Sequence, residues 1–132
     1  MKHATKITAV MVLVFSLFLM TSCIETQVSY EGASSFFVEN KTVQDLTVCF
    51  VLNSNSLEKT DSVNVTAKNT EKIWEGTCIG CNPTPEMILK SLSVYDKSAQ
   101  LVYEQVFIQN GKWIMQVKNS NISEYTLVIN SL

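Results

Sequence analysis

Short stretches in which apolar and polar side chains alternate are the feature that most limits how this chain can fold. A period of two places successive side chains on opposite faces of a β-strand, whereas a helix repeats every 3.6 residues. In residues 46–52 the even-numbered side chains are all large and apolar, and most of the odd-numbered ones are apolar too. The sequence therefore predicts short strands with 46–52 as a covered central strand, and no long helix beyond residue 35.

Eight such segments follow one another, and polar turn residues separate them. They lie at residues 35–39, 46–52, 61–66, 70–75, 90–95, 100–108, 112–118 and 123–130. The dipeptide Asn110-Gly111 stands between two apolar runs and is typical of a type I′ turn, so it predicts a β-hairpin. About seven or eight strands with regular turns favour an all-β, antiparallel β-sandwich, immunoglobulin-like or transthyretin-like, over a closed barrel. The order of the strands stays open.

The first 22 residues have the composition of an export signal. A positive start precedes an apolar run over residues 7–20 with two polar interruptions. This predicted helical signal segment is shorter than the about 20 apolar residues that a membrane-spanning helix needs. It ends at Leu19-Met20-Thr21-Ser22-Cys23, which resembles the lipobox of bacterial lipoproteins, with Met20 at a position where leucine is usual.

Cys23 is the predicted lipidation site and the predicted link to a membrane. Cleavage before Cys23 removes the signal peptide, residues 1–22, and leaves 110 residues (132 minus 22). Two or more acyl chains hold a protein on a bilayer essentially permanently. Ile24 stands where lipoproteins retained at the inner membrane carry Asp, so we expect the outer membrane, with either side possible. Residues 23–34 are the expected lipidated anchor and tether, and residues 35–132 the sandwich domain.

Composition narrows the chemistry of that domain. The only histidine is His3 in the leader, so no imidazole remains for a catalytic triad, a zinc site or proton transfer. The chain has no arginine, and eight lysines face twelve acidic residues after cleavage, a net charge of −4. Nucleic acid is therefore not an expected partner. We expect a non-enzymatic structural or binding module without a cofactor or a metal.

Cys78 and Cys81 form the one motif that could carry chemistry. A Cys-x-x-Cys pair acts in redox reactions where a helix N-terminus lowers the pKa of a thiol. Glycine and proline residues surround this pair and predict a turn-rich loop. A local disulfide or two unpaired thiols are the preferred interpretations, and a thiol redox accessory is the alternative. Cys49 lies inside an apolar strand and is predicted to be a small core residue.

Trp74 and Trp113 are the residues considered for stacking against a ligand. Both lie in predicted strands beside aliphatic residues, so core packing is the preferred interpretation. Exposure of either ring on a sheet face would favour a second alternative, a surface binder of glycans or peptides.

Short motifs spread over most of the predicted domain carry a family resemblance. They are Ser35–Thr42, Asp45–Val48, Ile79-Gly80, Asn82-Pro83, Val94–Lys97, Leu101–Tyr103, Trp113 and Tyr125–Ile129. These motifs resemble those of small lipoproteins of Bacteroides-type bacteria. The resemblance implies an envelope lipoprotein with a sandwich-like fold. Members of that group have no known function, so it implies no catalytic residues and leaves a protein or glycan partner open.

Overall fold

The computed structural model describes residues 29–54 and 58–130, so the predicted signal segment and Cys23 lie outside the described residues. Within that part, eight strands and two single-turn helices follow one another. They are β1 (Glu31–Asn40), β2 (Leu46–Leu52), β3 (Lys59–Val65), β4 (Thr70–Ile79), α2 (Pro85–Ile88), β5 (Leu89–Asp96), β6 (Leu101–Gln105), η2 (Asn110–Lys112), β7 (Trp113–Asn119) and β8 (Ile122–Ile129). The predicted all-β class is confirmed.

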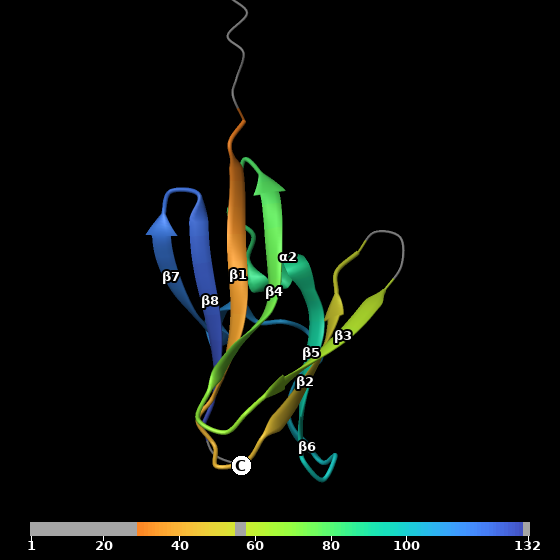
Figure 1. Ribbon diagram of the computed structural model, residues 1–132. Helices are drawn as coiled ribbons and strands as arrows, with labels where there is room; N and C mark the ends of the chain where they lie inside the picture. The colour runs from red at the N-terminus through yellow and green to blue at the C-terminus, as the bar shows by residue number, and fades with distance from the viewer. Residues whose placement is uncertain (1–28, 55–57, 131–132) are drawn as a thin grey trace, which may run out of the picture.

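The strands form two four-stranded sheets that pack face to face (Figure 1). Sheet A has the order β4-β1-β8-β7, and sheet B has the order β3-β2-β5-β6. Every pairing is antiparallel except that of β1 with β8, which are parallel. The predicted β-sandwich is therefore confirmed. Its first two strands lie in opposite sheets, whereas those of a constant immunoglobulin domain lie in one sheet.

The core consists of the inward-facing row of each strand. β2 buries its four even-numbered side chains from Leu46 to Leu52, as the alternation predicts. On the sheet A side, the ring of Phe36 packs against Trp113 and Tyr125, with centroid distances of 6.2 and 5.6 Å. Aromatic pairs at such distances add about 0.5–1.5 kcal/mol to the effect of burial. An aliphatic row and an aromatic cluster thus fill the space between the sheets.

β1 starts earlier than the sequence predicts. Residues 31–34 were assigned to the tether, but they pair with the end of β4, from Glu31 beside Ile79 to Ser34 beside Gly76. Three of the four are small residues, which do not produce the alternation of large apolar side chains that marks a strand. The folded domain therefore includes residues 31–34, and the segment between Cys23 and the sheet is shorter than expected.

The predicted hairpin at Asn110-Gly111 is wrong. β6 ends at Gln105, and the chain then crosses from sheet B to sheet A, where β7 pairs with β8. The dipeptide lies in η2 instead. The side chain of Asn110 accepts a hydrogen bond from the N–H of Glu86 at 2.9 Å and donates one to the Glu86 carboxylate at 3.1 Å. A contact with α2 thus stabilises this crossing, and turn propensity does not encode such a contact.

Candidate functional site

The described chain begins at one end of sheet A, which we call the proximal end. It comprises the start of β1, the end of β4 and the β7–β8 turn: Tyr30, Glu31, Ile79, Gly80, Ser120, Asn121 and Ile122. Backbone hydrogen bonds of 2.8 Å join these segments, from Gly80 N–H to the carbonyl of Tyr30 and from Ala33 N–H to the carbonyl of Asn121. The proximal end lies at the top of Figure 1.

The Cys78–Cys81 pair lies beside the proximal end and is bonded as a disulfide, with Cα atoms 5.4 Å apart. Cys78 belongs to β4, and the chain then reverses through Gly80, whose φ of 75° suits a residue without a side chain. Of the two preferred interpretations, the structure has the disulfide. In this state neither cysteine offers a thiolate, which is the reactive form of the residue.

The disulfide turn packs closely on the inner face of β1. A Cβ atom at Gly32 would lie 2.0 Å from the carbonyl oxygen of Cys81 and 2.3 Å from Oδ1 of Asn82. A Cβ atom at Gly76, on the neighbouring strand, would lie 2.7 Å from Cδ1 of Ile88 in α2. The two glycines therefore make room for the segment between β4 and β5 where it crosses sheet A. Gly32 was predicted only as a tether residue, so its role was missed.

Asn82 links this turn to the start of β8. Its Nδ2 donates to the carbonyl of Ser120 at 3.1 Å and to Oγ of Ser123 at 3.4 Å. Asn82 Oδ1 and the Oγ of Ser34 are buried without a hydrogen-bond partner among the described residues. Buried polar atoms of this kind cost about 1–3 kcal/mol each. The hydrogen bonds of Asn82 therefore connect the disulfide turn to the β7–β8 turn and to β8.

The helix that follows the disulfide is not positioned to activate a thiol. α2 begins at Pro85, four positions after Cys81, and has only four residues. Low thiol pKa values in Cys-x-x-Cys proteins depend on the aligned peptide dipoles of a helix that starts at the motif. The described geometry therefore lacks the feature that the redox alternative requires.

Cys49 lies on the outer face of β2, which corrects its prediction as a core residue. The inward row of β2 is the even-numbered one, so the odd-numbered Cys49 faces away from sheet A and is half-buried. Its cross-strand neighbours are Ser62 on β3 and Ser93 on β5. Cys49 is the free thiol of the described part of the chain.

The two tryptophans occupy different environments. Trp113 is only 5% exposed and packs on Phe36, so neither face of its ring is open to a ligand. Trp74 is half-buried at the edge of the sandwich, 6.2 Å from the ring of Phe50, and the ammonium group of Lys59 lies 5.1 Å from its centroid. The open part of the Trp74 ring thus already has a cation–π partner.

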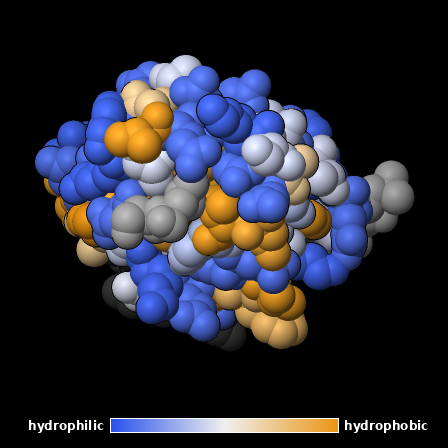
Figure 2. Space-filling model, turned by 90° about the horizontal axis from the view of Figure 1, so that it is seen from below, coloured by the Kyte–Doolittle hydropathy of each residue, from blue (hydrophilic) through white to orange (hydrophobic). Residues whose placement is uncertain are grey.

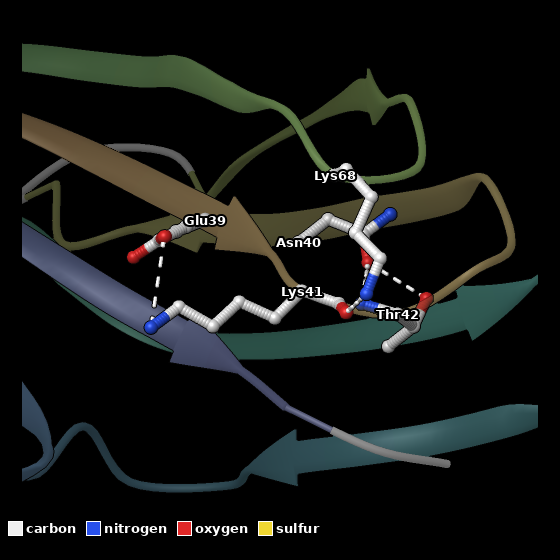
Figure 3. Close-up of polar contacts among 5 residues, drawn as sticks. All are labelled: Glu39, Asn40, Lys41, Thr42 and Lys68. Carbon is white, nitrogen blue, oxygen red and sulfur yellow. Dashed lines mark hydrogen bonds and ion pairs between the residues drawn. The ribbon is translucent and has the colours of Figure 1, made fainter.

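A polar cluster closes the opposite end of the domain. The buried side chain of Asn40 accepts hydrogen bonds from the N–H and O–H groups of Thr42, at 2.9 and 2.7 Å (Figure 3). Its amide nitrogen donates to the carbonyls of Gln44 and Val65, at 2.7 and 3.0 Å. Because both polar atoms of Asn40 have partners, this cluster is a structural joint between β1, β2 and β3. In the sequence, residues 40–42 are recognisable only as part of the Ser35–Thr42 motif and of the polar stretch between two predicted strands.

We call this opposite end the distal end and define it by the turns at residues 41–45, 67–69 and 97–100. Lys68 has a φ of 61° in one of these turns, and its ammonium group donates to the carbonyl of Lys41. Figure 3 also shows the ion pair of Lys41 with Glu39, at 3.8 Å. Figure 2 looks onto this end, where hydrophilic residues cover most of the surface and apolar groups form separate patches.

A depression of about 360 Å³ lies at the crossing from β6 to η2. It is lined by Tyr103, Glu104, Gln105, Val106, Phe107, Gln109 and Lys112. The Gln105 amide donates to the hydroxyl of Tyr103 at 2.6 Å and accepts from Gln109 N–H at 3.0 Å, so these groups are already paired. Phe107 is 79% exposed. The sequence placed it inside a strand and gave no sign of this exposure.

β7 is an edge strand with exposed apolar side chains on both faces. Ile114, Met115 and Val117 are each more than half exposed, and only Trp113 of this strand is buried. Sheet B does not cover the inner face of β7 beyond that residue. Hydrophobic edge strands offer unpaired backbone groups as well as apolar surface, so β7 is a site of potential strand pairing.

The charged groups of the described residues lie at the surface. Lys72 donates to Glu75 at 3.0 Å, and this hydrogen bond and the positive charge hold the pKa of Glu75 below its usual value. No group of three or more potential metal ligands occurs in the part of the chain that the structure describes. In the same ranges, no helix has the length and apolar character to cross a membrane.

Comparisons with known proteins identify no relative. No family model matches the chain, and no curated protein and no solved structure matches it either. The resemblance to small lipoproteins of Bacteroides-type bacteria therefore stays a prediction.

Proposed function

We propose that this protein is a bacterial envelope lipoprotein, held by acyl chains on Cys23, whose β-sandwich acts as a non-enzymatic structural or binding module. The observation that carries the proposal is the Cys78–Cys81 disulfide, because disulfides persist in oxidising compartments outside the cytosol. An exported chain meets this condition, and the leader that ends at Cys23 is an export signal by composition. Ile24 favours the outer membrane.

The short connection between Cys23 and the sandwich supports the same proposal. β1 begins at Glu31, eight positions after Cys23 (31 minus 23). Eight residues span at most about 29 Å even when fully extended. An acylated Cys23 would therefore hold the domain close to the membrane surface, where a small module acts on other envelope components.

The test of the anchor is metabolic labelling with an alkyne analogue of palmitate in a bacterial host. We expect the wild-type chain to carry the label and Cys23→Ala to lose it. Cys49→Ser is the matched control, because it removes the free thiol of the described residues and should keep the label. Undiminished labelling of Cys23→Ala would overturn the proposal.

If the module binds a ligand, the exposure of Phe107 favours the depression between β6 and η2 as the binding site. Phe107 is 79% exposed beside Tyr103, and exposed aromatic rings supply stacking surfaces for sugars and peptides. The exposure of Phe107 supports a glycan- or peptide-binding role at this depression and not at Trp74 or Trp113. The test is binding to an array of envelope glycans and peptides. We expect the wild-type domain to bind some of them and Phe107→Ala to lose that binding. Identical binding profiles of wild type and Phe107→Ala would oppose a site at this depression.

The redox alternative can be separated from a structural disulfide by titration. Structural disulfides have reduction potentials below about −300 mV, whereas catalytic pairs lie higher. Without a helix that starts at the motif, we expect Cys78 and Cys81 to behave as a structural pair. Equilibration with glutathione and dithiothreitol buffers, read by thiol alkylation, gives the potential, and a value near −200 mV would favour the redox alternative.

A further inference from the structure

Apolar side chains gather at the end of the domain where the chain enters it. Ile79 is 76% exposed, Tyr30 44% and Ile122 42%, and all three belong to the proximal end. Ile79 and Ile122 lie on the same face of sheet A, because they pair with Glu31 and Ala33 of β1, whose side chains alternate with the buried row. They come from strands on either side of β1, and Figure 1 shows these strand ends side by side.

The disulfide holds Ile79 in this exposed position. Ile79 and Gly80 are the two residues enclosed by the Cys78–Cys81 bond, so they form the tip of a covalently closed turn. The close packing of Cys81 against Gly32 keeps that turn against β1. An isoleucine at the tip of a fixed turn is presented to the surroundings, and no neighbouring segment of the described chain covers it.

The two ends of the domain differ in charge. Among the seven residues of the proximal end, Glu31 is the one that carries a charge. The distal turns contain Lys41, Asp45, Lys68 and Lys97. Val43 is an exposed apolar residue of the distal end, at 83%, but it stands between charged turns. Of the two ends, the proximal end therefore meets an apolar phase more favourably.

We propose that the proximal end rests against a phospholipid bilayer, with Ile79 and Ile122 entering the interfacial region and Tyr30 at its level. This rests on the proposed lipid anchor at Cys23, which keeps the start of β1 within about 29 Å of the bilayer. Apolar side chains add to the membrane affinity of an acylated protein, and tyrosine suits the interface because its ring is apolar and its hydroxyl polar. The acyl chains on Cys23 and the apolar side chains of the proximal end would thus contact the same bilayer. A protein partner could bind the proximal end only by displacing lipid from it.

Tryptophan quenching in vesicles tests this contact on the full, lipidated chain. The probes are Ile79→Trp and, as the matched control at the distal end, Val43→Trp; both replaced residues are exposed, so both variants should fold. The proteins are bound to two kinds of phosphatidylethanolamine–phosphatidylglycerol vesicles. One kind also contains a lipid with brominated acyl chains, which quenches nearby tryptophan, and the other does not. Interfacial side chains sit about 5–10 Å into the headgroup–acyl boundary, so bromine should reduce the emission of Ile79→Trp by roughly a third or more. Wild-type protein, with Trp74 and Trp113, provides the background.

The outcomes separate the contact from the anchor. Quenching of Ile79→Trp without quenching of Val43→Trp supports the contact, and the same result for Ile122→Trp would support it independently. If the proteins sediment with vesicles but neither new tryptophan is quenched beyond background, the contact is overturned and the anchor stands. If the full chain carries no acyl group and stays in the supernatant, the anchor is overturned and the contact with it.

Discussion

Single buried residues determine how the strands of this domain meet. Asn40 joins three strands because its two polar atoms pair with a hydroxyl, an N–H group and carbonyls that the turns would otherwise leave unpaired. Gly32 is needed because it has no side chain: a methyl group at that position would occupy the space of the disulfide turn. In the sequence, both residues look like ordinary turn or tether residues, because neither role produces a local pattern.

Gly32→Ala should destabilise the domain by about 3 kcal/mol, the upper part of the range for overpacking. The added Cβ would lie 2.0 Å from a backbone oxygen, which cannot move away as a flexible side chain could. Gly111→Ala is the matched control, because its Cβ would meet no atom within 4 Å, and we expect a change of less than about 1 kcal/mol. Urea unfolding measures both; equal stability of the two variants would contradict the packing described at Gly32.

Tyr125 makes the stability of the domain depend on alkaline pH. Burial of the phenol raises its pKa above the usual value of about 10, because the charged form loses hydration. A raised pKa in the folded state gives stability that is fully present below the unfolded pKa and is lost as the pH rises through the folded pKa. Tyr125→Phe should therefore lose less stability than wild type between about pH 8 and pH 11. Urea unfolding midpoints of wild type and Tyr125→Phe at the two pH values test this. Equal decreases of the midpoint in the two proteins would refute it.

Local pattern predicted the individual elements well, and long-range packing accounts for what it missed. β2 lies where the alternation placed it, and all eight predicted strands are present. The early start of β1 escaped because glycine and serine carry no hydrophobic signal. The Asn110-Gly111 hairpin was wrong because the dipeptide reports local dihedral preference, while the Asn110–Glu86 hydrogen bonds belong to tertiary structure. The spacing of Cys78 and Cys81 predicted a local disulfide as one of two preferred interpretations, but no sequence pattern indicated the exposure of Phe107.

The disulfide turn should contribute modestly to stability. In the chain-entropy model, closing a loop of about four residues is worth roughly 2 kcal/mol. We expect the double variant Cys78→Ser/Cys81→Ser to fold and to lose about that amount in urea unfolding, while Cys49→Ser loses less because it breaks no covalent link. A double variant that does not fold would mean that the turn holds sheet A together by more than loop closure.

At the scale of the whole molecule, the domain has a proximal end with one charged residue and exposed apolar side chains, a distal end with four charged residues, and a hydrophobic edge at β7. The difference between the proximal and the distal end is compatible with the proposed lipid anchor at Cys23. The edge is different, because it lies along the side of the sandwich and remains exposed whichever end faces the bilayer. Hydrophobic edge strands promote association between copies unless charges interrupt them.

Val117→Lys should reduce self-association of the purified protein. The substitution adds a charge to an exposed position of β7, and the folded state loses little because the side chain is 60% exposed. Val43→Lys adds the same charge at an exposed position outside any strand and should leave association unchanged. Light scattering over a concentration series compares the three proteins. Equal scattering by Val117→Lys and wild type would exclude β7 as the associating edge.

The parallel pairing of β1 with β8 also sets when the domain can fold. Ala33 and Ile122 are neighbours in the sheet although 89 positions separate them in the chain (122 minus 33). Pairings between distant segments form late, because the chain loses the entropy of closing a long loop before the strand contacts contribute favourable free energy. While the carboxyl-terminal strand is still being synthesised, β1 lacks its second neighbour and sheet A is incomplete. The domain can therefore complete sheet A only after the whole of β8 is available to pair with β1.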